Sequence, residues 1–151
     1  MIEFTTGPAE EGWSSFAVRL DTRTWTCHAS YVGSYPLRDL IWAAVDIYDH
    51  MFFDPLPVEN AVWHVSAADE PGGIVVRIVP VDGKVKVSVL PHEFLMPDPE
   101  SLSADLISGE SIVDYWSFAK AVFTDAARTI VRHGFTGLRE AWEPRRWDID
   151  S

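Results

Sequence analysis

The chain has 151 residues, of which 47% are hydrophobic, so it is long enough to form one domain with a sizeable core. It carries 12 Lys and Arg and 23 Asp and Glu, for a formal charge of −11 at pH 7. A surface this acidic disfavours nucleic-acid binding and favours a basic protein partner, although acidity also serves solubility alone.

The location of the protein is predicted from two further features. No apolar run of about 18 residues is available to span a bilayer, and residues 1–11 lack the basic and then apolar pattern of a secretory signal. The single cysteine, Cys27, excludes an internal disulfide framework and fits a reducing compartment. We therefore expect a cytoplasmic protein without a membrane segment.

The N-terminal part predicts a β-hairpin. Residues 1–12 offer one short strand, at residues 2–5, and are otherwise loose and acidic. Apolar and polar residues then alternate over residues 13–20 and again over residues 25–31, as in strands with one buried face. Because neighbouring strand residues point to opposite faces, His28 cannot activate the thiol of Cys27, which we interpret as a core residue.

A helix is predicted to begin at Pro36 and to end before the prolines of residues 54–57. Its wide apolar face contains eight residues: Leu37, Leu40, Ile41, Ala44, Val45, Tyr48, Met51 and Phe52. Trp42 falls instead among the polar residues Arg38, Asp39, Asp46 and Asp49. It is either covered by a neighbouring segment or exposed as an anchor for a partner.

Three strands are predicted next, at residues 61–66, 74–81 and 84–90. Asp82-Gly83 is the strongest two-residue hairpin signal in the chain, and its turn sets the register. It places Ile78 opposite Val87 and Val76 opposite Val89, on the core side. Residues 91–111 then form a long acidic connection, and connections of this length are usually functional or flexible.

A second amphipathic helix is predicted over residues 115–133. Its apolar face comprises Tyr115, Phe118, Ala119, Val122, Phe123, Ala126 and Ile130, and Asp125 falls on its polar face. Asp114 is placed to cap its start, and Gly134 supplies the left-handed residue that ends it. A short extra helical turn follows at residues 137–143, and then a tail at residues 144–151.

These elements predict a single α+β domain over residues 1–151, in the order ββαβββα, with residues 1–12 and 144–151 as candidates for flexible ends. The economical arrangement is one antiparallel sheet of about five strands with both helices packed on one face.

The search for chemistry yields little. Asp46 and His50 lie four residues apart on one helix face, but two such residues more often form a polar face than a metal site. No catalytic or phosphate-binding motif is present. We therefore predict no catalytic residues, no metal and no cofactor, and leave the question of enzymatic activity open, with a preference for a non-enzyme.

The C-terminal block carries a resemblance. Residues 118–122, Phe-Ala-Lys-Ala-Val, run to Gly134 and then to residues 137–142, Gly-Leu-Arg-Glu-Ala-Trp, followed by a proline. This block resembles the tail of small uncharacterised bacterial proteins. The wider layout is similar to that of the acidic α+β proteins that serve as immunity proteins for polymorphic toxins. The resemblance implies a binding role and no catalytic residues.

The leading hypothesis is a non-enzymatic acidic protein, of the immunity or antitoxin type, that covers a basic protein partner. The surface predicted to bind that partner comprises Trp42, Asp46, Asp49, Asp98, Glu100 and Asp105. One alternative is an enzyme or a small-ligand-binding protein that uses a cleft near residues 91–111, with His92 and Glu93 at its mouth. A second is a homodimer or structural subunit that self-associates through the outer sheet face around Val79.

Overall fold

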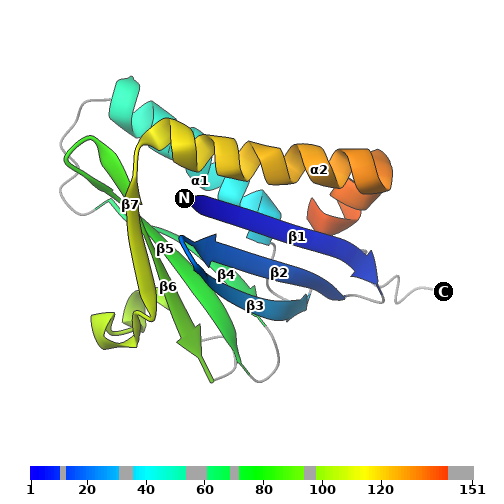
Figure 1. The fold of residues 1–151 in the computed structure, drawn as a ribbon, viewed down its shortest axis with the longest axis horizontal. Coiled ribbons are helices and arrows are strands. Elements are labelled where there is room, and N and C mark those ends of the chain that lie inside the picture. Colours follow the sequence, from blue (N-terminus) through cyan, green and yellow to red (C-terminus); the bar gives the residue numbers. More distant parts are fainter. Residues whose placement is uncertain (11–12, 31–35, 54–60, 69–71, 94–97, 143–151) are drawn as a thin grey trace.

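The computed structural model describes residues 1–10, 13–30, 36–53, 61–68, 72–93 and 98–142. It shows an α+β protein with two helices and two antiparallel sheets (Figure 1). The first sheet has the order β1-β2-β3 and the second the order β4-β5-β6-β7. In chain order the elements are β1 (Ile2–Glu10), β2 (Trp13–Leu20), β3 (Arg23–Ser30), α1 (Pro36–Phe52), β4 (Trp63–Ala68), β5 (Gly73–Val81), β6 (Lys84–His92), the 3₁₀ turns η1 (Pro99–Ser101) and η2 (Ala104–Leu106), β7 (Gly109–Val113) and α2 (Tyr115–Trp142).

The prediction of one sheet of about five strands is wrong, because the strands divide into a sheet of three and a sheet of four. The division falls where α1 separates β3 from β4. These two strands lie next to each other, and the thiol of Cys27 on β3 donates to the carbonyl of Ala67 on β4 at 3.6 Å. Alternation in the sequence shows which side chains face inward, but it carries no signal for which strands pair across a helix.

The turn at Asp82-Gly83 confirms the predicted register of β5 and β6. Both turn residues have positive φ, 50° and 74°, as a two-residue hairpin turn requires. Ile78 pairs with Val87 and Val76 with Val89, and all four side chains are fully buried. A local turn signal and two alternating strands are enough to specify this hairpin completely.

The second sheet contains one strand that was not predicted. β7 begins within the predicted connection over residues 91–111, extends beyond its end to Val113, and pairs with β6. Its five residues do not alternate between apolar and polar types, since Ile112 faces solvent while Ser111 lies on the inner side opposite Val87. Its pairing with β6 therefore depends on the tertiary fold rather than on a local pattern.

β1 is longer than predicted and forms the edge of the first sheet. It pairs with β2 through a register shift between Thr6 and Ala9, a bulge that contains Gly7 and Pro8. Proline is tolerated in such a place because a bulge on an edge strand does not need its missing N–H. This interruption explains why the sequence pattern identified only residues 2–5 as a strand.

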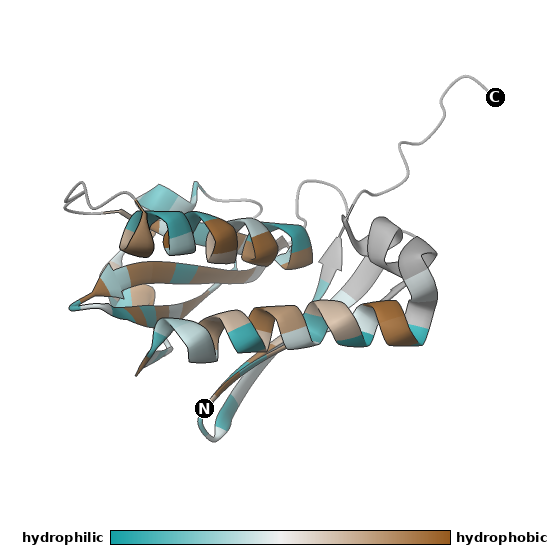
Figure 2. Ribbon diagram, turned by 90° about the horizontal axis from the view of Figure 1, so that it is seen from above, coloured by the Kyte–Doolittle hydropathy of each residue, from teal (hydrophilic) through white to brown (hydrophobic). Residues whose placement is uncertain are grey.

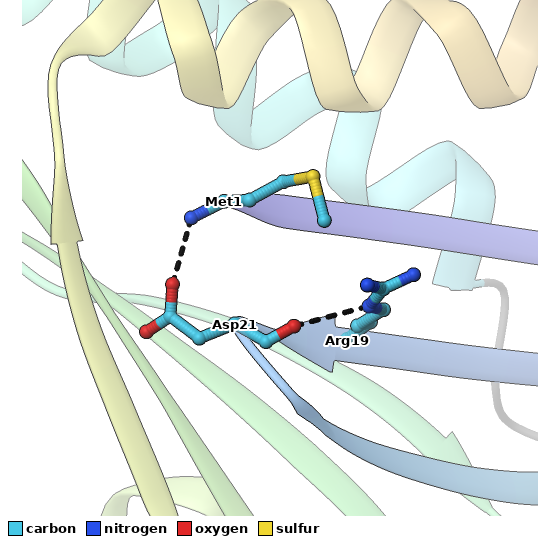
Figure 3. Close-up of polar contacts among 3 residues, drawn as sticks. All are labelled: Met1, Arg19 and Asp21. Carbon is cyan, nitrogen blue, oxygen red and sulfur yellow. Dashed lines mark hydrogen bonds and ion pairs between the residues drawn. The ribbon is translucent and has the colours of Figure 1, made fainter.

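The start of β1 is attached to the β2–β3 turn. The N-terminal ammonium group of Met1 forms an ion pair with Asp21 at 2.8 Å, and the amide of Asp21 donates to the carbonyl of Met1 at 2.8 Å. The side chain of Arg19 donates to the carbonyl of Asp21 at 3.1 Å (Figure 3). Because these groups are exposed, we attribute alignment of the strand ends to them rather than a large stabilisation.

The core lies between the two helices and the inner faces of both sheets. Both helices lie on the same side of the strands and run beside each other (Figure 1), and hydrophobic residues recur along each of them (Figure 2). The largest fully buried side chains come from all of these elements, among them Phe4, Phe16, Leu40, Ile47, Ile78 and Phe118. The two sheets thus share one core with the helices.

α2 packs along β1, and a buried carboxylate joins them. Asp125 was predicted on the polar face of the helix, but its side chain is 0% exposed. Its two carboxylate oxygens accept hydrogen bonds from the amide of Thr6 at 2.9 Å and from the hydroxyl of Thr6 at 2.7 Å. The prediction was wrong because the edge of β1 supplies two donors, which a helical wheel does not show.

The two ends of the first stretch of α2 follow the sequence signals. Asp114 caps the helix, since its carboxylate accepts from the amide of Ser117 at 2.9 Å and from its hydroxyl at 2.6 Å. These hydrogen bonds lower the pKa of Asp114. At the other end Gly134 has φ 67° and ψ −174°, a conformation essentially restricted to glycine, and a further helical stretch continues to Trp142.

A junction between the sheets is built around Trp25 of β3. The indole Nε1 of Trp25 donates to the hydroxyl of Ser108 at 3.1 Å, and the guanidinium of Arg23 lies 4.7 Å from the centre of the indole ring. Arg23 also donates to the carbonyl and to the hydroxyl of Ser108. A Cβ at Gly109 would overlap the far edge of the Trp25 ring, so the close approach requires glycine.

The buried carboxylate gives a prediction about pH. Burial raises the pKa of Asp125 above its ordinary value of 3.8, while the hydrogen bonds from Thr6 oppose the shift. Its contribution to stability is therefore fully present below the ordinary pKa and lost as the pH rises through the raised one. We expect the free energy of unfolding of Asp125→Asn, minus that of the wild type, to increase across this window in urea titrations. A difference that is independent of pH would contradict this expectation.

The junction gives a second prediction. Gly109→Ala adds a methyl group against Trp25, and we expect it to lower the free energy of unfolding by about 1–3 kcal/mol, the usual cost of overpacking. Ser111→Ala on the same strand is the matched control, and adding Trp25→Phe should recover much of the loss by making space. Urea unfolding of the four proteins measures this, and an unchanged Gly109→Ala variant would argue against the close packing.

Candidate functional site

One exposed stripe of α1 contains half of the residues predicted to bind a partner. Trp42, Asp46 and Asp49 are spaced by four and three residues, so they lie along one side of the helix. Phe53, the first residue after the helix, extends this side, because its amide donates to the carbonyl of Asp49 at 3.0 Å as in a further helical turn. Trp42 is 54% exposed and Phe53 is 70% exposed. This set, which we name the α1 stripe, is roughly 16 Å long at the helical rise, with an aromatic ring at each end and two carboxylates between them.

The C-terminal end of the stripe merges with five aromatic side chains from both helices. Tyr48 and Phe52 come from the end of α1, Phe53 from the turn that follows it, and Tyr115 and Trp116 from the start of α2. We name these five residues the aromatic cluster. Neighbouring ring centres are 5.1 to 6.0 Å apart. Phe52 and Trp116 are nearly parallel, at 22°, and are 49% and 62% exposed. Three large rings of the cluster therefore face solvent.

Tyr115 fixes the cluster to the fold. Its ring is buried, and its hydroxyl donates to the carbonyl of Ala44 in α1 at 2.7 Å. Burial raises the pKa of this phenol, with smaller contributions from Tyr48 and from the negative charge of Asp49. The hydroxyl therefore remains a protonated donor at neutral pH, and α2 presents the next residue, Trp116, beside the end of α1.

The charges next to the exposed rings are mostly negative. Asp49 lies one helical turn before Phe52 and Phe53, and Asp114 immediately precedes Tyr115. Asp46 lies one turn further back along the stripe, and Lys120 lies one turn beyond Trp116 on α2. All four side chains are exposed. Three carboxylates thus border the aromatic cluster, with one ammonium group on its α2 side.

The structure corrects the predicted apolar face of α1. Val45 and Phe52 were assigned to the buried face but are 42% and 49% exposed, whereas Ala43 and Ile47 are buried. The helix packs mainly against α2 and β4. The face that contacts them is rotated toward Ala43 and Ile47, which leaves Phe52 at the surface.

The other half of the predicted surface lies elsewhere. Asp98, Glu100 and Asp105 are exposed on the segment that carries η1 and η2. This segment lies on the outer face of the second sheet, on the other side of the strands from the helices (Figure 1). The six residues therefore form two separate acidic surfaces, one on α1 and one on the η1–η2 segment.

Arg77 of β5 holds the η1–η2 segment on the sheet. Its Nη2 donates to the carbonyls of Leu102 at 2.9 Å and Pro99 at 3.4 Å, and its Nε donates to Nε2 of His64 at 3.1 Å. Burial, and after it the charge of Arg77, lowers the pKa of His64. His64 therefore stays neutral and can accept the hydrogen bond at neutral pH.

The outer sheet face offers less apolar surface than the sequence suggests. Val75 and Leu90 are buried, and Val79 is half-buried. Ser88, also buried, donates to the carboxylate of Glu110 at 2.7 Å. Residues 94–97, on which the predicted cleft partly falls, lie outside the described residues, as does the tail at residues 144–151. Of the two residues placed at that cleft, His92 is half-buried and Glu93 is exposed.

The described residues contain no group of three or more His, Cys, Asp and Glu side chains that could hold a metal ion, so Asp46 and His50 gain no third ligand among them. The ring of His50 instead packs edge-on against Trp63 at 5.8 Å. Neither helix is long and apolar enough, over its described residues, to cross a membrane.

In three comparisons with known proteins, no family model, no curated protein and no solved structure matches this chain.

The sequence reasoning missed the aromatic cluster, although a signal for it exists. Phe52–Phe53, at the end of α1, and Tyr115–Trp116, at the start of α2, are two pairs of adjacent aromatic residues. Adjacent helical positions differ by 100°, so a narrow apolar face cannot bury both rings of a pair. One ring of each pair must lie at the edge of the face or in solvent, and Phe53 and Trp116 do so here.

The hydrogen bonds from Arg77 to the η1–η2 segment give a third prediction. Arg77→Leu removes the donors to Leu102 and Pro99, so we expect the amides of Leu106 and Ile107 to exchange with solvent several-fold faster, because their segment opens more easily. Hydrogen exchange followed by NMR measures this. Lys86→Leu, on the neighbouring strand and the same face, is the matched control; equal exchange in all three proteins would show that Arg77 does not hold the segment.

Proposed function

We propose that this protein is a non-enzymatic binding protein of the immunity or antitoxin type, which covers a basic protein partner with the α1 stripe and the aromatic cluster. The observation that carries the proposal is the exposure of Phe53 and Trp116, at 70% and 62%, beside the carboxylates of Asp46, Asp49 and Asp114. Aromatic anchors with a charged border are the usual composition of an interface hot spot.

The rigidity of the surface supports this role. The rings of the cluster contact one another, and Tyr115 binds the backbone of α1. Because these contacts restrict the rings before a partner arrives, binding costs less conformational entropy than it would with freely rotating side chains. Both helices are anchored in the core on their other faces, so the surface is presented by regular secondary structure.

The charge of the chain supports a basic partner. A formal charge of −11 raises the local concentration of a positively charged protein and speeds its encounter at low salt. The carboxylates beside the rings then favour positive groups at the contact itself. The second acidic surface, on the η1–η2 segment, lies on the far side of the sheet. It is therefore not part of the contact that we propose for the α1 stripe and the aromatic cluster.

The test is quantitative affinity capture from lysate of the source organism at low and high salt. The wild type is compared with the double variant Phe53→Ser, Trp116→Ser. We expect the wild type to retain one basic protein, less of it at high salt, and the double variant to bind that protein at least tenfold more weakly, as the loss of two hot-spot residues implies.

The matched control is Val131→Ser, which removes an apolar side chain that is 85% exposed and lies about four turns along α2 from Trp116. The double variant loses the ring contacts of Phe53 and Trp116, so we expect it to unfold at lower urea than the other two proteins but to remain folded under the capture conditions, which circular dichroism checks. Retention of the same partner by the double variant, or the absence of any basic partner in the wild-type capture, would overturn the proposal.

A further inference from the structure

We infer that the aromatic cluster recognises an arginine side chain of the basic partner, with the guanidinium group stacked on the exposed rings of Phe52 and Trp116 and paired with Asp49 or Asp114. This inference rests on the proposed function and deepens it, because it specifies the chemistry of the contact.

The rings provide the platform. Phe52 and Trp116 are nearly parallel, with an angle of 22° and a centre-to-centre distance of 6.0 Å, and each is about half exposed or more. A tryptophan face is the best aromatic acceptor for a cation, and a planar guanidinium stacks on it more extensively than a compact ammonium group does. The chain itself uses this contact at another place, where Arg23 lies over the ring of Trp25 at 4.7 Å.

The carboxylates provide the counter-charge on both sides of the platform. Asp49 precedes Phe52 by one turn of α1, and its negative charge contributes to the raised pKa of Tyr115 in the cluster. Asp114 lies at the start of α2, where its hydrogen bonds to Ser117 keep the carboxylate ionised. A guanidinium group can stack on a ring and still direct N–H donors at a carboxylate in its own plane.

Other occupants of the cluster fit the charges less well. An acidic segment would be repelled by Asp46, Asp49 and Asp114, and a second copy of the chain would bring a further formal charge of −11. A purely apolar segment would leave these carboxylates facing it without a partner, at a cost in desolvation. A basic segment satisfies both the rings and the carboxylates.

The experiment uses the full chain and three synthetic peptides of equal length, in which glycine alternates with arginine, with lysine or with citrulline, the uncharged isostere of arginine. Calorimetry measures each affinity at low salt, and the indole N–H signal of Trp116, assigned with Trp116→Phe, reports the place of binding. We expect the arginine peptide to bind about threefold or more tighter than the lysine peptide, the citrulline peptide to bind weakest, and the Trp116 signal to shift.

Variants separate stacking from charge. Trp116→Ala should abolish the preference for arginine over lysine while leaving the charge attraction, Asp49→Asn should weaken both cationic peptides, and Val131→Ser should change neither. Equal affinities for the two cationic peptides, a preference that survives Trp116→Ala, or no binding of either peptide would each overturn the inference. The peptide results do not depend on the protein captured from lysate. If the Phe53→Ser, Trp116→Ser variant loses that protein but the arginine peptide binds no tighter than the lysine peptide, the proposed function would stand and only the inference about arginine would fail.

Discussion

The packing of α2 along β1 is the constraint on which the rest of the structure depends. β1 is the edge strand of the first sheet, and an uncovered edge would present unpaired backbone groups. The buried carboxylate of Asp125 accepts the amide and the hydroxyl of Thr6, while Phe4 and Phe118 meet edge to face with ring centres 6.1 Å apart. A charged or polar group in the core is costly unless it is hydrogen-bonded, so the Thr6 donors select one position for the helix.

That position determines the surface at the other end of α2. With Asp125 held on β1, the first turn of the helix lies beside the C-terminal half of α1. There the hydroxyl of Tyr115 donates to the carbonyl of Ala44, and its ring contacts Tyr48 and Phe52. Trp116 then follows at the next helical position and lies against Phe52. The aromatic cluster is thus a consequence of how the core places two helices, although its exposed rings contribute little to that core themselves.

The parts of the fold that the sequence predicted are those with local causes. The Asp82-Gly83 turn, the Asp114 cap and the left-handed Gly134 each depend on residues within a few positions, and each is present in the structure. The division into two sheets, the pairing of β7 and the burial of Asp125 depend on residues far apart in the chain. Thr6 and Asp125, for example, are separated by 119 positions.

Of the residues predicted to bind a partner, only those that are close in the sequence share a surface in the structure. Trp42, Asp46 and Asp49 are local neighbours on one helix, so their spacing identified a shared face, and the structure adds Phe53 to it. Asp98, Glu100 and Asp105 were joined to them by charge alone, and charge carries no information about which side of a sheet a segment covers. The contribution of Trp116 could not be predicted, because it depends on where α2 begins relative to the end of α1 in space.

Exposed rings of this kind would favour self-association in a neutral protein, but the formal charge of −11 repels a second copy and attracts a basic chain. Under the function that we propose, this charge favours a basic partner over a second copy of the chain.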